Sequence, residues 1–202
     1  MRIRQHVNPK DLFFETFRGE RPVLPVDRAV EIEIGCADAQ FLFERAAIDP
    51  DRVYVGLEIR EDFVELVNKR ARASRAPVHA VFCQAQLHMA EIFPPGRVDR
   101  VYINFPDPWF KRRHRERRMV DPALVDGVAL ATRSGGDVFV QTDIWELAID
   151  AMSALERDGR FANDAGEWTF WRAGNPYGVR SWREQHAEEH GLPIWRLRYH
   201  RT

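Results

Sequence analysis

Short apolar runs alternate with amphipathic stretches along most of the chain. The first run, AVEIEIG at 29–35, ends on a glycine and predicts a strand followed by a tight turn. The next stretch, 38–48, has apolar residues at helical spacing behind Asp38, so we expect a helix with Asp38 as its N-cap. The same alternation predicts further strands at 52–59, 78–83, 98–105 and 137–142. It predicts further helices at 60–73, 86–93, 122–132 and 143–158.

These strands are too continuously apolar for a sheet with one solvated face. Apolar strands that alternate with helices are typical of a doubly wound, mostly parallel sheet with helices on both faces, which is an α/β fold. The SGG at 134–136 predicts a stop before the fifth strand. The C-terminal segment does not continue this alternation of strand and helix. There we expect a strand and loop at 166–178, a helix at 181–190 and a strand at 192–200. The C-terminal pair is expected to form an antiparallel edge.

The length of 202 residues and the composition, 45% hydrophobic and 30% charged, indicate one globular domain. We divide it into an N-terminal arm at 1–27, an α/β core at 29–158 and a C-terminal segment at 159–202. No apolar run is long enough to span a membrane, and the N-terminus lacks the apolar stretch of a secretory signal. The two cysteines have no metal or redox spacing. We therefore expect a cytoplasmic protein without metal, either a monomer or a homodimer.

The charge distribution is uneven. The whole chain carries −1, whereas KRRHRERR at 111–118 has six Lys/Arg and one Glu, so the remaining residues sum to −6. A mildly acidic body with one basic spot favours a localised site for an anion such as an RNA phosphate. Runs of like charge are usually solvated helix faces, and that alternative stays open here.

A candidate cofactor site follows from the ends of the predicted strands, where ligands bind in such sheets. Gly35 lies at the first strand-to-helix turn, where backbone must approach a ligand closely. Glu58 ends the second strand, where a carboxylate accepts hydrogen bonds from ribose hydroxyls. Asn104, at the end of the fourth strand, is assigned to the same site by its position. This pattern predicts a nucleoside cofactor.

A dinucleotide fits this turn poorly, because the G-x-G-x-x-G pattern is missing and Glu33 would repel a pyrophosphate. A cationic ligand suits Glu33 better, and S-adenosyl-L-methionine, with its ammonium and sulfonium groups, is such a ligand. Two alternatives stay open: Glu33 as a strand-end charge paired with Lys or Arg, and Glu58 as an exposed strand terminus.

Five stretches then carry a family resemblance: EIEIGCADAQFL, VGLEI, YINFPDPWFKRRHRERRMV, QTD and SWREQHAEEHGLPIWRLRY. In order and spacing the sequence resembles the bacterial tRNA (guanine-N7)-methyltransferases over nearly its whole length. The FPDPW-x-K-x-RH-x-x-RR run is the specific part. The resemblance implies a class I, Rossmann-like methyltransferase fold, in which 29–158 binds S-adenosyl-L-methionine and 159–202 lies on the substrate side. It implies methylation of the variable-loop guanosine of tRNA.

The resemblance also implies residue roles. Glu33 and Glu58 would bind the cofactor, and Gln84 would contact its adenine. Asp107 would serve catalysis, and the substrate-binding residues would be Lys111, Asp143, Ser181 and Glu184. Within the basic run, Arg113 and Arg117 are our choices for contacts with phosphates. Three departures stand out, because Ala37 and Ala39 replace glycines, Gln84 replaces Asp and Ser181 replaces Thr.

The chemistry of guanine N7 explains why the NFPDPW turn matters. N7 already carries an unshared pair, so catalysis rests on positioning and electrostatics rather than on a base. Methylation makes the ring positive and N1–H more acidic, so a carboxylate at Asp107 would bind the transition state more tightly than the ground state. Phe105 or Trp109 is expected to stack on the base. The alternative is a rigid connection whose aromatic residues belong to the core.

Other expectations compete with this one. The chain would otherwise be a methyltransferase for another RNA, a protein or a small molecule, or a catalytically weak RNA-binding relative that the alanines at 37 and 39 would suit. Four tryptophans are expected to pack in the core or at a sheet edge: Trp168, Trp171, Trp182 and Trp195. The cysteines Cys36 and Cys83 are expected to be small core residues.

Overall fold

The structure is a computed structural model that describes residues 7–8, 11–108 and 119–202. Within these residues, seven strands form one sheet in the order β3-β2-β1-β4-β5-β7-β6. The strands are β1 (Val30–Ile34), β2 (Val53–Glu58), β3 (Val78–Phe82), β4 (Val98–Asn104), β5 (Thr132–Thr142), β6 (Phe161–Asn163) and β7 (Trp195–Arg201). Strands β1 to β5 pair in parallel, and β7 pairs antiparallel with β5 and β6. The predicted doubly wound sheet with an antiparallel C-terminal edge is confirmed.

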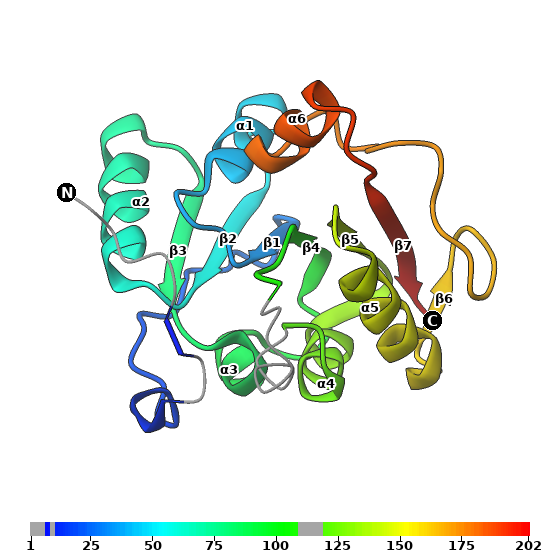
Figure 1. Cartoon of the computed structure of the whole chain (residues 1–202). Helices are drawn as coiled ribbons and strands as arrows, with labels where there is room; N and C mark the ends of the chain where they lie inside the picture. The colour runs from blue at the N-terminus through cyan, green and yellow to red at the C-terminus, as the bar shows by residue number, and fades with distance from the viewer. Residues whose placement is uncertain (1–6, 9–10, 109–118) are drawn as a thin grey trace.

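Helices cover both faces of this sheet (Figure 1). They are α1 (Gln40–Ile48), α2 (Glu61–Ser74), α3 (Ala85–Ile92), α4 (Pro122–Ala131), α5 (Trp145–Asp158) and α6 (Trp182–Glu189), preceded by a 3-10 helix, η1 (Leu12–Phe14). Buried side chains of α3, α4 and α5 share one apolar cluster with the strands, and those of α1 and α2 share a second. The sheet is therefore the middle layer of three, as the apolar strands predicted.

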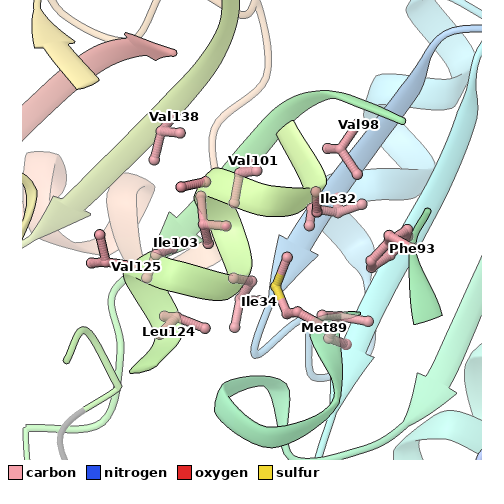
Figure 2. Close-up of a cluster of buried hydrophobic side chains, with 14 of the residues drawn as sticks. Ile32, Ile34, Met89, Phe93, Val98, Val101, Ile103, Leu124, Val125 and Val138 are labelled. Atoms are coloured by element: carbon pink, nitrogen blue, oxygen red, sulfur yellow. The ribbon is translucent and has the colours of Figure 1, made fainter. Parts of the chain in front are cut away.

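Alternation along β1 assigns its side chains to the two faces. Ile32 and Ile34 are almost completely buried in the cluster under α3 and α4, with Met89 and Leu124 as neighbours in the same cluster (Figure 2). Glu31 and Glu33, which alternate with them, must point to the other face, because successive side chains of a strand alternate. All five positions of β1 are buried, so both faces of this strand lie inside the protein.

On the acidic face of β1, the carboxylate of Glu31 has a structural role. Glu31 is 0% exposed and accepts hydrogen bonds from Arg45 at 3.1 Å, Arg100 at 2.8 Å and the hydroxyl of Tyr102 at 2.7 Å. Arg52 lies 3.4 Å from the same carboxylate. One buried carboxylate is thus shared by three guanidinium groups that come from separate parts of the chain, and it ties α1 to the sheet.

Local sequence explains where the helices begin and end. Asp121 caps α4 by accepting from the Leu124 N–H at 2.9 Å, and Pro122 fills the first turn, where its missing N–H costs nothing. Ser181 caps α6 in the same way. Helix α5 stops at Gly159, which adopts a left-handed conformation with φ of 74°.

The predicted stop at 134–136 is wrong, because β5 begins at Thr132 and runs through these residues. Gly136 is required there by space rather than by a turn. A Cβ on Gly136 would lie 2.7 Å from the Thr132 side chain and 3.0 Å from the Asp99 carbonyl oxygen, so the glycine permits close strand packing.

Two further expectations are corrected. The strand expected within 166–178 is absent from the described structure, where the edge strand is instead Phe161–Asn163. The N-cap of α1 is Ala39 rather than Asp38, although the Asp38 carboxylate accepts a hydrogen bond from the Gln40 N–H at 3.2 Å. The remaining predicted elements agree with the structure to within about two residues, except that β7 begins at Trp195, three residues later than expected.

Candidate functional site

The carboxyl ends of the parallel strands open onto a cavity of about 520 Å3. It lies where the strand order reverses between β1 and β4, which is the topological switch point of such a sheet. Eight of the predicted site residues line it: Glu33, Gly35, Glu58, Gln84, Asn104, Asp107, Asp143 and Ser181. Glu184 does not line it. Trp109, Lys111, Arg113 and Arg117 lie outside the described residues.

Glu33 is a buried carboxylate that faces this cavity. Its Oε1 accepts a hydrogen bond from Asn104 Nδ2 at 2.8 Å, and its buried Oε2 has no hydrogen-bond partner in the described part of the chain. Burial raises the pKa of Glu33 to about 8; the Asn104 hydrogen bond opposes this, and the charges of Asp38 and Glu58 add to it. Among the described residues, Glu33 therefore has no strand-end pair with Lys or Arg. A buried, unpaired carboxylate oxygen suits a cationic donor such as an ammonium group.

Glu58 is 2% exposed, so the alternative of an exposed strand terminus is wrong. Its Oε2 accepts from the Ala37 N–H at 2.8 Å, which ties it to the glycine turn after β1. Arg60 donates to both carboxylate oxygens, each at 2.8 Å. Ribose hydroxyls that reach Glu58 must therefore share the carboxylate with Arg60 or displace it, because one carboxylate has about four acceptor positions.

Asp107 projects into the cavity from the turn that follows β4. It is exposed and stands between Pro106 and Pro108, which restrict the backbone on both sides. The pKa of Arg60 lies above its usual value: burial lowers it, but the hydrogen bond to Glu58 and the charges of Glu58 and Asp107 raise it. The positive charge of Arg60 thus interacts with both candidate carboxylates, Glu58 and Asp107.

The turn after β1 adopts three left-handed backbone conformations. Gly35 has φ of 78°, Ala37 of 49° and Ala39 of 53°. Only glycine enters this region without strain, so the two alanines hold a conformation built for glycine. A Cβ on Gly35 would lie 3.1 Å from the Met119 side chain, so this position has little space for a larger residue.

The opposite wall of the cavity is formed by the start of α6 and the end of β5. Arg183 Nη2 lies 2.5 Å from Asp143 Oδ2, so the predicted substrate residue Asp143 already holds a cation. Trp182 also lines the cavity and is 70% exposed, so its expected packing role is wrong. Its ring stacks on His186, with centroids 5.4 Å apart. The only signal in the sequence was its place directly after Ser181.

Glu184 is 0% exposed and belongs to a buried hydrogen-bonded group. Its carboxylate accepts from Gln141 at 2.9 Å, Asn175 at 2.8 Å and Arg196 at 2.8 Å. Gln141 was not singled out from the sequence, yet its Nε2 also donates to Asn104 Oδ1 at 2.9 Å. The structure therefore places Glu184 behind the cavity wall rather than on it.

Gln84 uses its side chain to start α3. Its Oε1 accepts from the Leu87 N–H at 2.9 Å, and its Nε2 donates to Gln86 Oε1 at 2.7 Å. An adenine amino group at this position would have to take the second lone pair of that oxygen.

Cys36 and Cys83 line the cavity as buried thiols, and burial raises the pKa of each, so both stay protonated.

Across 7–8, 11–108 and 119–202, no helix is both long and apolar enough to cross a membrane. The same ranges contain no cluster of three or more His, Cys, Asp or Glu side chains arranged to hold a metal ion.

Sequence relatives decide the family. A family model described as "Putative methyltransferase" matches residues 27–197. A tRNA (guanine-N(7)-)-methyltransferase of Synechococcus sp. (strain WH7803) is 39% identical, covering 99% of this chain and 88% of the relative. One of Thermosynechococcus vestitus is 35% identical, covering 100% of this chain and 95% of the relative. The chain belongs to the tRNA (guanine-N(7)-)-methyltransferase family. The resemblance inferred from the sequence is thus confirmed.

Solved structures support the fold of this family member. The 16S rRNA methyltransferase KamB superposes with a TM-score of 0.58 and 16% identity, covering 86% of this chain and 88% of KamB. The aminoglycoside resistance methyltransferase NpmB1 gives 0.56 and 16%, covering 89% and 90%. At this identity the likeness establishes the class I methyltransferase architecture alone.

The cavity of this tRNA (guanine-N(7)-)-methyltransferase family member has two unlike walls. One wall holds the buried carboxylates Glu33 and Glu58 at the ends of β1 and β2. The other holds the exposed groups Asp107 and Trp182, with the Asp143–Arg183 pair at 2.5 Å. Such an arrangement can bind a cationic nucleoside on one side and present a second, planar and polar molecule to it from the other.

Proposed function

We propose that this chain transfers a methyl group from S-adenosyl-L-methionine to N7 of a guanine in tRNA, in the variable loop. The observation that carries the proposal is that Glu33, buried with one unpaired oxygen, and Asp107, exposed on a proline-bounded turn, face the same cavity. When bound, S-adenosyl-L-methionine supplies a methyl group activated by a sulfonium. Membership of the family supports tRNA as the substrate.

The cofactor wall is assigned by charge. Glu33 holds the ammonium group through its unpaired oxygen, and Asn104 keeps the other oxygen in place at 2.8 Å. Glu58 receives the ribose hydroxyls in competition with Arg60. Because Glu33 and Glu58 both lie out of water, their electrostatic interactions with a cation are stronger than at the surface.

The residues of the substrate wall are assigned from the hydrogen-bond donors that guanine offers. Asp107 accepts hydrogen bonds from N1–H and the exocyclic amine, an edge that adenine lacks. As N7 acquires the methyl group, the ring becomes positive and these bonds strengthen, so Asp107 favours the transition state. No proton has to leave N7, and the chain therefore needs no general base at that atom.

The remaining substrate contacts follow the cavity rim. Trp182 offers an exposed ring on which a turned-out base stacks. Asp143 acts through Arg183, because one N–H group of Arg183 contacts the Asp143 carboxylate. The other N–H groups of Arg183 bind an RNA phosphate. Lys111, Arg113 and Arg117 contact further phosphates, which predicts that the affinity for RNA falls steeply with salt.

The test uses purified protein, S-adenosyl-L-methionine with a labelled methyl group and an unmodified tRNA transcript. We expect 7-methylguanosine at one variable-loop position. The variant Asp107→Asn is expected to lower kcat/KM on the order of 10- to 100-fold while cofactor affinity is retained, because a hydrogen bond to a charged group is worth about 1.5–3 kcal/mol.

The matched control is Glu65→Gln, the same acid-to-amide change on the exposed side of α2, which should leave both quantities unchanged. Absence of 7-methylguanosine with several transcripts would refute the proposal. Turnover that needs no RNA would point instead to a small-molecule or protein methyltransferase. Protein that binds tRNA but not the cofactor would be the catalytically weak RNA-binding relative.

A further inference from the structure

A row of polar side chains crosses four neighbouring strands, beginning at the cavity and continuing away from it. Glu33 lies on β1, Asn104 on β4, Gln141 on β5 and Arg196 on β7. Asn104 and Gln141 are register partners, and so are Gln141 and Arg196. Hydrogen bonds join the row at 2.8 Å, 2.9 Å and 3.2 Å from Glu33 to Arg196. Glu184 of α6 closes its far end against Gln141 and Arg196.

Only one orientation of Gln141 satisfies its neighbours. Glu184 can only accept hydrogen bonds when ionised, and Arg196 can only donate. Gln141 therefore turns Nε2 to Glu184 and Oε1 to Arg196, at 2.9 Å and 3.2 Å. The reverse orientation would set donor against donor and acceptor against acceptor in a site where Gln141 and Glu184 are 0% exposed.

The orientation of Gln141 also fixes that of Asn104, which contacts Glu33 at the cavity. The second hydrogen of Gln141 Nε2 goes to Asn104 Oδ1, so Asn104 must turn its own amine to Glu33 Oε1. An Asn104 turned the other way would present an oxygen to the carboxylate. We propose that Gln141 and Glu184 are positioning residues, which fix Asn104 as a donor to Glu33 and so favour the carboxylate form of Glu33 that a cationic cofactor group requires. The inference rests on the proposed function in taking Glu33 as the group that holds the cofactor.

It also changes the role expected of Glu184. A substrate-binding carboxylate must reach the substrate, whereas Glu184 is 0% exposed and already accepts from three side chains. Its action on the reaction is therefore indirect, through Gln141 and Asn104. The C-terminal segment that carries Glu184 and Arg196 thereby sets the chemistry of a residue on the first strand.

The test is an exchange of the two groups, Gln141→Glu together with Glu184→Gln. The exchanged pair keeps one carboxylate beside Arg196 and one amide beside Asn175, so the fold retains a charge-matched buried group. The hydrogen bond between position 141 and Asn104 is reversed, because a glutamate at position 141 can only accept and Asn104 must then donate to it. Asn104 turns its oxygen to Glu33, which favours the protonated, uncharged form of Glu33 and disfavours a bound ammonium group.

Calorimetric titration with S-adenosylhomocysteine between pH 6 and pH 9 gives the readout. We expect binding by the exchange variant to be about 10- to 100-fold weaker near neutral pH. We also expect the affinity of the variant to be still rising at pH 9, where that of the unaltered protein has levelled off, because Glu33 of the variant releases its proton at a higher pH. The other charged groups that face Glu33, namely Asp38 and Glu58 with its partner Arg60, are unchanged in both proteins, as is Cys36.

A second variant separates positioning from loss of stability. Asn68 bridges α2 to β3 through two hydrogen bonds with the Ala80 backbone, both 2.8 Å, and does not line the cavity. Asn68→Leu should lower the urea midpoint yet leave the affinity and its pH profile unchanged. An exchange variant that is folded and binds as the unaltered protein does would overturn the inference, as would an Asn68→Leu profile shifted in the same way. Failure of the unaltered protein to bind S-adenosylhomocysteine would instead contradict the proposed function.

Discussion

The two alanines of the turn after β1 give opposite predictions for one and the same substitution. Ala37 and Ala39 both hold left-handed backbone, with φ of 49° and 53°. Replacement by glycine relieves about 1–2 kcal/mol of strain at either position. It also gives the unfolded chain more freedom, which costs about 0.4–1 kcal/mol. For Ala37, which is only half-buried, the balance raises the free energy of unfolding by about 0.5–1 kcal/mol.

Ala39 differs because its methyl group is 0% exposed. Removing it forfeits about 0.8 kcal/mol of burial and leaves a small cavity, a combined loss of about 1–1.5 kcal/mol. Ala39→Gly is therefore expected to lower the free energy of unfolding by up to about 1 kcal/mol, whereas Ala37→Gly raises it. The expected difference between the two variants comes from burial, since their φ angles are nearly equal.

Urea unfolding followed by tryptophan fluorescence measures both changes as shifts of the midpoint at constant slope. Ala73→Gly, on the exposed side of α2, calibrates the ordinary cost of glycine in a helix, about 1 kcal/mol. Destabilisation by Ala37→Gly as large as that by Ala73→Gly would refute the relief of backbone strain at this turn. A higher stability of Ala39→Gly than of Ala37→Gly would refute the role assigned to burial.

Three further outcomes are expected. Glu31→Ala should lower the free energy of unfolding by about 3–5 kcal/mol in urea, because three buried or half-buried guanidinium groups lose their common carboxylate; a loss below about 1 kcal/mol would contradict this. The ligand-free protein should lose stability as the pH rises from 4.5 to about 8, since folded Glu33 keeps a proton that the unfolded chain releases; Glu33→Gln should flatten this slope, and an unchanged slope would assign it to other groups. Trp182→Ala should weaken tRNA binding by about 1–3 kcal/mol in filter binding without changing cofactor affinity, whereas Trp168→Ala, an exposed tryptophan away from the cavity, should do neither; equal losses would refute stacking by Trp182.

The sequence was informative where function depends on position along a strand. Glu33, Glu58 and Asn104 were found because strand ends of a doubly wound sheet meet at one edge, and all three line the cavity. Apolar runs and helical spacing likewise located most of the elements to within about two residues. The exceptions were local. At 134–136 the strand continues through glycines because close packing requires them, and spacing alone cannot distinguish this from a turn.

Contacts between distant segments were beyond such reasoning. Ser181 and Glu184 have the spacing of a capping box, in which the Glu side chain returns to the N-cap backbone. Ser181 does cap the Glu184 N–H at 3.2 Å, but the Glu184 carboxylate bonds side chains of β5, β7 and the loop at Asn175 instead. Nothing within one helical turn predicts those partners, because only the sheet register brings them together. Trp182 was expected to pack in the core or at a sheet edge, because the sequence does not show that α6 begins at the cavity.

The sheet order itself explains why a C-terminal residue can govern a carboxylate on the first strand. Insertion of β7 next to β5 puts Arg196 in register with Gln141, and the parallel pair β4–β5 puts Gln141 in register with Asn104. A fixed donor at one end of this row and an acceptor-only group at the other leave the two amides between them no choice of orientation. Exchange of any acid for an amide along the row must therefore reverse a hydrogen bond somewhere, and the buried position of the row makes that reversal costly.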